Sequence, residues 1–160
     1  MRETKTHIYF WGSELSNFWD APFQMDGLKF ATSEQAFMYL KAKQFNDDEI
    51  ALKILKAPTP LHAKKLGRAV RGYDDDIWSS VRYEAMVTAL EHKFARPDMK
   101  RFLLSTTNKT LVEASPYDVI WGVGLSEDDN RILHERNWKG QNLLGIALME
   151  VRRRLIQECE

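Results

Sequence analysis

Residues 32–45 form a segment in which apolar residues leave almost no polar face. Thr32 to Gln35 matches a capping box, with Thr32 as the N-cap and Gln35 at the third helical position, so a helix is expected to begin here. The residues that follow are nearly all apolar: Ala36, Phe37, Met38, Tyr39, Leu40 and Ala42. A helix without a polar face is normally buried. We therefore expect this helix to be buried on all sides.

The first 30 residues are typical of β-structure instead. Residues 7–11 are rich in strand-forming residues, and Asp26-Gly27 separates two short segments, 23–25 and 28–30. Asp-Gly between such segments is a strong signal for a type I′ hairpin turn. Two later segments, 111–114 and 119–125, are also expected to be strands. The sequence therefore predicts a small amount of sheet.

The remaining helices are marked by prolines, caps and apolar periodicity. A helix over 48–56 stops before Pro58, and the next runs from Thr59-Pro60, an N-cap followed by a proline at the first helical position, to Arg68. Acidic residues 74–76 precede an amphipathic helix over 77–95, where the macrodipole favours negative charge. Further helices are expected at 99–105 and 143–157. The polar, aperiodic segment 126–140 predicts a long loop that is functional or mobile.

This order of elements predicts an α+β fold, a mainly helical single domain over residues 1–160 with a small β-sheet. A chain of 160 residues with 44% apolar residues has the size and the material for one core. Its 23 Lys and Arg residues balance 23 Asp and Glu residues, so no global basic field favours nucleic acid or membrane. Cys159 is the only cysteine, which excludes an intramolecular disulfide and fits a reducing compartment. Without a leader or a long apolar segment, we expect a cytoplasmic protein with no membrane partner.

Glu34 and Lys41 form the most informative charged pair, because both lie on the otherwise apolar helix. Seven residues make nearly two turns, which places them on one face, roughly 10 Å apart along the axis. Partial desolvation raises the pKa of a carboxyl group and lowers that of an amine, toward the range used in acid–base or nucleophilic catalysis. Alternatively, Glu34 complements the helix N-terminus and Lys41 extends to solvent. On chemistry alone the second explanation is favoured.

Three loops carry groups suited to a ligand, and each also has an ordinary structural explanation. Residues 15–19 combine hydroxyl and amide groups with aromatic rings, but Ser-Asn is also a common turn. Residues 117–124 offer two glycines, a carboxylate and a stacking face, or form a strand with a bulge. Residues 140–145 precede the last helix, where free N–H groups can hold a phosphate, or where an asparagine caps the helix. The one dense basic cluster suits a pyrophosphate or nucleic acid, or is a solvated face; it comprises Lys64, Lys65, Arg68 and Arg71.

Several familiar sites are missing from the sequence. It contains no Walker loop, no GxGxxG motif after a strand and no HExxH motif, and its four histidines are scattered. We therefore expect no metal and no cofactor.

Taken together, the motifs resemble the NADAR, or YbiA-like, family over about residues 8–155. The matching positions are residues 15–18, 33–34, Phe37, Lys41, 65–68, Trp78, Met86, 89–90, 93–94, Asp118, 121–124, 140–142, 144–145 and 148–149. No single motif is specific, but their order and spacing over nearly the whole chain are. One position differs: Val123 stands where some members have aspartate in Trp-Gly-Asp-Gly, which leaves the substrate open.

The resemblance implies an α+β domain with N-glycosidase activity that releases a base or amine from a ribosyl phosphate. The implied partners are ADP-ribosyl or phosphoribosyl small molecules, namely ADP-ribose on guanine, free or in nucleic acid, and early riboflavin-pathway intermediates. It makes Glu34 and Lys41 the catalytic pair. The substrate-binding positions it implies are Ser16, Asn17, Phe18, Arg68, Trp78, Asp118, Trp121, Gly122, Gly124, Gly140 and Asn142.

Two other functions fit the same residues. A non-catalytic module that binds ADP-ribose or NAD would keep the fold, and a factor acting on a modified base within a nucleic acid would use the basic cluster. In an N-glycosidase, Glu34 is expected to act as the acid–base group. Lys41, if neutral, alternatively attacks C1 of the ribose and forms a Schiff base.

Overall fold

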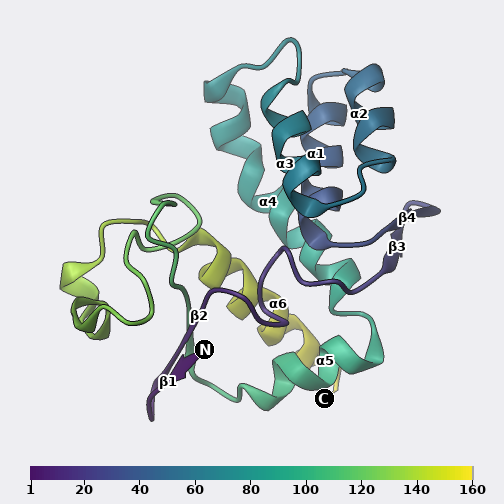
Figure 1. Cartoon of the computed structure of the whole chain (residues 1–160). Helices are drawn as coiled ribbons and strands as arrows, with labels where there is room; N and C mark the ends of the chain where they lie inside the picture. Colours follow the sequence, from purple (N-terminus) through teal and green to yellow (C-terminus); the bar gives the residue numbers. More distant parts are fainter. Residues whose placement is uncertain (160) are drawn as a thin grey trace. The chain divides into compact units, whose positions relative to one another are not determined.

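The computed structural model describes residues 1–159 and divides the chain into two compact units (Figure 1). Residues 17–96 form one, named here the helical unit. Met1–Ser16 and the chain from Pro97 onwards form the other, named here the mixed unit. The expected α+β class, mainly helical with small sheets, is confirmed. That the whole chain is one domain stays a prediction.

The helical unit is built around α1 (Ser33–Gln44), which contacts α2 (Asp48–Leu55), α3 (Pro60–Arg68) and α4 (Asp75–Lys93) (Figure 1). Its first six residues and Ala42 are buried. Burial on all sides therefore holds for its first half. It is wrong for the last turns, where residues 39–41 are half-buried and Lys43 and Gln44 are exposed.

The predicted helix caps explain where these helices begin. Thr32 accepts a hydrogen bond from the Gln35 N–H at 3.2 Å, and Thr59 caps α3 by accepting from the His62 N–H at 3.1 Å. The Gln35 side chain does not return to Thr32. It accepts from the Ala31 N–H at 2.8 Å and donates to the Ile54 carbonyl at 2.9 Å, so it joins the start of α1 to the end of α2.

The predicted hairpin is also present in the helical unit. Strands β3 (Phe23–Met25) and β4 (Leu28–Phe30) pair antiparallel. Asp26 and Gly27 have φ angles of 54° and 77°, as the two central residues of a type I′ turn require.

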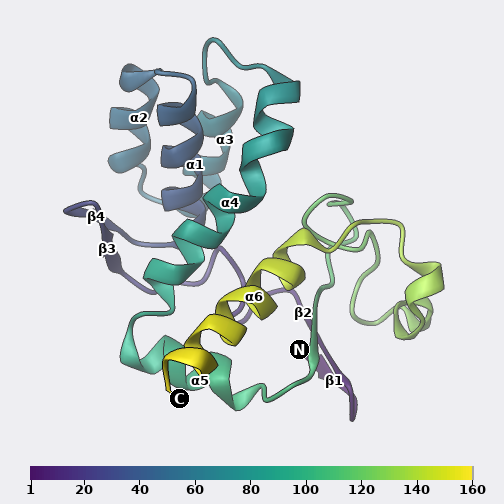
Figure 2. The ribbon, with the colours of Figure 1, turned by 180° about the vertical axis from the view of Figure 1, so that it is seen from behind.

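The mixed unit contains a three-stranded sheet in the order β1-β2-β5. β1 (Arg2–Glu3), which the sequence did not predict, is antiparallel to β2 (His7–Phe10), and β5 (Thr110–Glu113) is parallel to β2. The last helix, α6 (Leu143–Glu158), packs against β5 and contacts α5 (Pro97–Ser105) (Figure 2). A buried cluster beside this sheet comprises Tyr9, Val112, Ala114, Val123, Leu125 and Ile132.

One predicted strand, residues 119–125, is wrong. The segment pairs with no strand because its carbonyl groups accept hydrogen bonds from the segment that leads into α6. The loop expected over 126–140 holds two short 3₁₀ helices, η1 (Asn130–Leu133) and η2 (Glu135–Asn137). None of the helices in residues 1–159 is long and apolar enough to cross a membrane.

Candidate active site

Glu34 occupies the first turn of α1 in the helical unit and is 7% exposed. Its backbone N–H donates to the Asn17 carbonyl at 3.0 Å. The neighbouring Ser33 hydroxyl donates to the side-chain oxygen of Asn17 at 2.8 Å, and the Asn17 amide approaches the Met86 sulfur at 3.5 Å. Asn17 was predicted as a ligand contact; in the structure its two oxygens accept hydrogen bonds from the turn that carries Glu34, and its amide contacts α4.

Lys41 lies two turns further along α1, half-buried among aromatic rings. Its Nζ is 4.7 Å from the centroid of the Tyr73 ring and 5.9 Å from that of Trp78. Phe37 packs on Trp78 with ring centroids 5.3 Å apart, and Phe45 meets Tyr73 edge-on at 5.4 Å. The lysine thus has aromatic neighbours from α4 and from the loop before α4, and rings at positions 37 and 45 pack against those neighbours.

Burial lowers the pKa of Lys41 below its ordinary value, because the ammonium form loses water contacts. The charge of Glu34 acts in the opposite direction and raises that pKa, as does Asp75. Arg68, at the end of α3, lowers it. Glu34, Lys41 and Arg68, all predicted from the sequence, therefore share one electrostatic environment in the helical unit.

The predicted aromatic residues of this unit differ in their surroundings. Trp78 is buried against Phe37 and near Lys41. Phe18 is 42% exposed, and the Nζ of Lys64 lies 5.9 Å from its ring centroid. Phe18 therefore offers stacking surface at the unit's surface, whereas Trp78 lies buried beside the catalytic candidates.

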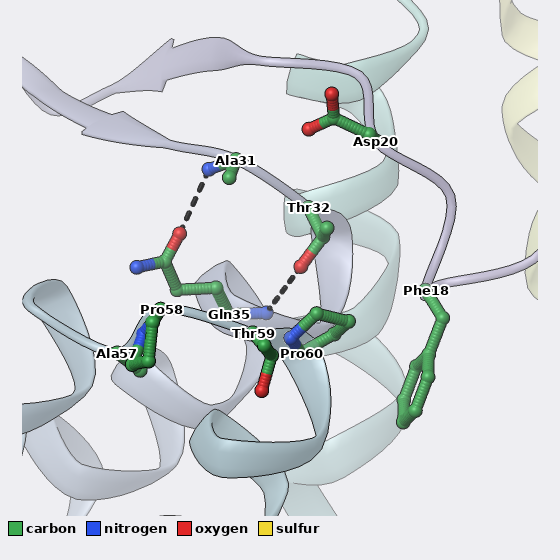
Figure 3. A pocket seen from close by; sticks show the side chains of 9 residues that line it. All are labelled: Phe18, Asp20, Ala31, Thr32, Gln35, Ala57, Pro58, Thr59 and Pro60. Carbon is green, nitrogen blue, oxygen red and sulfur yellow. Dashed lines mark hydrogen bonds between the residues drawn. The ribbon is translucent and has the colours of Figure 1, made fainter.

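Phe18 also lines a cavity of about 230 Å³ (Figure 3). The cavity lies between the loop before β3, the start of α1 and the turn that leads into α3, and neither Glu34 nor Lys41 lines it. Figure 3 shows Thr32 and Gln35 in their capping hydrogen bonds at its wall. Its lining residues are Phe18, Asp20, Ala31, Thr32, Gln35, Ala57, Pro58, Thr59 and Pro60.

The remaining predicted contacts belong to the mixed unit, where most of them hold a loop together. Asp118 accepts hydrogen bonds from the Ile120 and Trp121 N–H groups at 2.9 and 2.8 Å. Gly140 packs so closely that a Cβ would lie 2.2 Å from the Gly122 carbonyl oxygen. Close backbone approach, rather than an open cradle, therefore explains these two glycines.

For three other predicted residues of the mixed unit, the structure shows a local backbone or hydrogen-bonding role. Gly124 has a φ of +73°, which favours glycine. The Ser16 N–H donates to the Ser13 carbonyl at 2.8 Å, within a turn. Asn142 is buried with a φ of 54°; its side chain accepts from the Glu113 N–H and donates to the Leu111 carbonyl, both at 3.0 Å. Contact of these residues with a ligand stays a prediction.

Of the two alternatives for the segment before α6, the one with backbone N–H groups available to a phosphate does not hold for residues 141–144. All four donate to carbonyl groups of residues 119–122, at 2.9 to 3.2 Å. The loop that the sequence predicted as a strand therefore caps the helix, and it satisfies the donors that an anion would need.

The basic cluster is also partly engaged. The Arg71 guanidinium bonds to Asp47 at 2.9 Å and to Glu49 at 3.1 Å, and the Arg71 N–H donates to Asp47 as well. This arrangement joins the start of α2 to the loop after α3. Arg71 therefore serves an intramolecular ion pair in the helical unit.

The sequence missed two residues beside Lys41, Tyr73 and Asp75. They lie on the turn that enters α4, and only the folded turn brings them to α1; the acidic run 74–76 signalled no more than a helix start. Within residues 1–159, no group of three or more His, Cys, Asp or Glu side chains is arranged to hold a metal ion.

Comparison with known proteins decides the family. The model of the NADAR domain matches residues 9–156, nearly the range over which the sequence motifs were expected to match. The chain belongs to the NADAR family. It is 44% identical over 131 residues to protein irg-1 of Caenorhabditis elegans, a match that spans 80% of this chain and only 62% of that protein.

Two NADAR relatives match over most of both chains. N-glycosidase R617 of Acanthamoeba polyphaga mimivirus is 35% identical over 164 residues, covering 94% of this chain and 96% of that protein. The solved structure of the Escherichia coli protein YbiA superposes with a TM-score of 0.78 at 31% identity, covering 99% of this chain and 89% of YbiA.

Proposed function

We propose that this NADAR protein is an N-glycosidase that hydrolyses the C1–N bond of a phosphate-bearing ribosyl compound. The observation that carries the proposal is the pair on α1: Glu34, nearly buried and held by Asn17, and Lys41, half-buried and subject to the charge of Glu34. The name of the mimiviral relative, an N-glycosidase, supports the reaction class.

The chemistry requires one water molecule. As the C1–N bond breaks, C1 of the ribose gains oxocarbenium character, which a nearby carboxylate stabilises. Water then supplies a hydroxyl group to C1, and its remaining proton replaces the one delivered to the leaving nitrogen. The products are the ribose with a C1 hydroxyl and the released base or amine. In this scheme Glu34 is the acid–base group.

Lys41 provides a second route in its neutral form, which its lowered pKa favours. Its Nζ attacks C1, the base leaves, and the ribose ring opens to a Schiff base that water hydrolyses. Borohydride added during turnover would reduce the Schiff base and leave a stable adduct on Lys41. Turnover without any adduct would exclude this route and leave Lys41 as a cation that assists binding or charge stabilisation.

The substrates we propose are ADP-ribose attached to guanine, free or within a nucleic acid, and early phosphoribosylated intermediates of riboflavin synthesis. Arg68 is a candidate phosphate contact because it is exposed and its charge acts on Lys41. Trp78 and Phe18 are candidate stacking surfaces. The proposed contacts in the mixed unit are Ser16, Asp118, Trp121, Gly122, Gly124, Gly140 and Asn142.

Base release from each of these substrates tests the proposal. The protein is incubated with ADP-ribosyl-guanosine, ADP-ribosylated DNA, NAD and the riboflavin intermediates, and products are followed by chromatography. Glu34→Gln should lower kcat on the order of 10²–10⁴-fold, the usual contribution of an acid–base group. Glu84→Gln, at an exposed position of α4, is the matched control and should keep full activity.

Two results would contradict the proposal. Equal release by the wild type and Glu34→Gln would remove Glu34 from the mechanism. No release from any substrate, together with tight binding of ADP-ribose, would favour the non-catalytic module. Release from DNA that falls steeply between 50 and 200 mM salt, on the order of 10³-fold or more, would identify a nucleic acid as the target.

A further inference from the structure

Tyr73 lies in the loop between α3 and α4, directly after Gly72, whose φ is +74°. None of the sequence motifs includes it. Its ring is 44% exposed, and one face lies 4.7 Å from the Nζ of Lys41. An ammonium group within about 6 Å of a ring centroid is attracted by the negative face of the ring.

The ring is held from two sides. The Tyr73 hydroxyl donates a hydrogen bond to Asp75 at 2.7 Å, in the first turn of α4. The ring of Phe45, the C-cap residue of α1, meets the Tyr73 ring edge-on. A tyrosine side chain has only two rotatable torsions, so these two contacts restrict both. The Lys41 ammonium therefore lies against a fixed surface.

The charged groups that act on Lys41 come from three helices of the unit. Glu34 acts from α1 itself, Arg68 from α3 and Asp75 from α4. The hydrogen bond to Asp75 also raises the pKa of the Tyr73 hydroxyl, so the hydroxyl remains the donor at neutral pH. Tyr73 thus links Lys41 to Asp75: its face contacts the cation and its hydroxyl contacts the anion.

We propose that Tyr73 is a positioning residue for Lys41: its ring face holds the Lys41 ammonium, and its hydrogen bond to Asp75 fixes the ring. This proposal rests on the proposed function in one respect only: it assumes that Lys41 takes part in catalysis. A lysine side chain has four rotatable torsions, and a catalytic group that loses its place by about 1 Å can cost on the order of 100-fold in rate. Tyr73 removes that freedom by holding the ammonium against its ring.

Two substitutions separate the ring from the hydroxyl. Tyr73→Phe keeps the ring face and loses the bond to Asp75, whereas Tyr73→Leu loses both while keeping an apolar side chain beside Lys41. The first readout is the pKa of Lys41, measured by NMR after reductive methylation of the lysines with ¹³C-formaldehyde. The Lys41 signal is assigned with Lys41→Arg.

Tyr73→Leu should lower the pKa of Lys41, because the charged form loses the ring face while burial remains. Tyr73→Phe should lower it by less, because the ring face remains beside Lys41 while the hydrogen bond that fixes the ring is lost. Asp75→Asn should lower it, because it removes a negative charge that acts on Lys41. The signals of lysines distant from Tyr73 are the internal control, and thermal unfolding confirms that each variant is folded.

The second readout is turnover. Tyr73→Leu should lower kcat about 10-fold or more with little change in KM, and Tyr73→Phe should lower it by less, because its ring face remains beside Lys41. An unchanged Lys41 pKa in Tyr73→Leu would overturn the proposal, whatever Asp75→Asn does. So would a Tyr73→Phe variant as impaired as Tyr73→Leu, since the ring face would then not be the part that matters.

The two proposals fail in different ways. If the wild type releases no base from any substrate, the proposed function fails, but the NMR titration still decides whether Tyr73 holds Lys41. If the wild type is active and Tyr73→Leu changes neither the Lys41 pKa nor kcat, only the role of Tyr73 fails.

Discussion

At the scale of single residues, Glu34 and Lys41 stand on one helix and are coupled through their charges. The carboxylate raises the pKa of a lysine that burial lowers, so the state of Lys41 depends on which charges remain around it. Arg68 acts in the opposite direction to Glu34. Changing these two neighbours should therefore move the reactivity of Lys41 in opposite directions.

This prediction concerns the rate at which an amine-specific reagent labels Lys41. Glu34→Gln removes a charge that raises the pKa of Lys41, so the neutral fraction at pH 8 should grow and labelling should become several-fold faster. Arg68→Gln should raise that pKa and slow the labelling. Mass spectrometry of peptides that contain Lys41 measures both rates, with Glu84→Gln as the control. A change of the same sign in both variants would show that accessibility, not charge, sets the rate.

Single residues also show which contacts can be predicted from the sequence and which cannot. Thr32 and Thr59 cap their helices as predicted, because capping depends on three or four neighbouring residues. The bond that Asn142 makes to Leu111 joins residues 31 positions apart, and no local pattern signals it. Likewise, Lys41 could be chosen from its helix, but the ring of Tyr73 beside it could not.

At the scale of elements, the best predicted segments are those with their own start and stop signals. The hairpin at Asp26-Gly27 and helices α2 and α3 are confirmed nearly to the residue. Residues 119–125 look like a strand because they consist only of apolar residues and glycines, yet their carbonyl groups accept hydrogen bonds from N–H groups within residues 139–144. A segment that caps a helix distant in sequence cannot be recognised from its own composition. The α1 pair of the candidate site was therefore predictable, and the roles of the loop residues were not.

The close contact between α6 and β5 predicts that a larger residue at position 145 destabilises the protein. A Cβ added to Gly145, in the first turns of α6, would lie 2.0 Å from the Leu111 carbonyl oxygen of β5. Gly145→Ala should therefore push the helix from the strand and lower the free energy of unfolding by about 1–3 kcal/mol, as overpacking usually does. Urea denaturation measures the change. Gly12→Ala is the matched control, because a Cβ there meets nothing within 4 Å.

At the scale of the whole molecule, each unit carries carboxylates whose charged form is favoured by arginine. Arg131 lowers the pKa of Asp129 to about 2, and Arg153 lowers that of Glu150 to about 2. In the helical unit, Arg71 holds the pKa of Asp47 well below its usual range. The Asp47 side chain is 1% exposed and also caps α2 through the Ile50 N–H. Of the three, Asp47 is the most enclosed by its partners.

Stability should therefore decrease in acid, and Asp47 should account for part of the decrease. A carboxyl group with a depressed pKa in the folded state stabilises the fold above its unfolded pKa, about 4, and that contribution is lost as the pH falls toward the folded value. Asp47→Asn should lower the urea midpoint at pH 7 and remove up to about one proton from the pH dependence of unfolding between pH 5 and 2. Asp76→Asn, at an exposed position of α4, is the control. If Asp47→Asn kept the full wild-type pH dependence, the ion pair with Arg71 would not account for any of the acid sensitivity, which would then come from other carboxylates, such as Asp129 and Glu150.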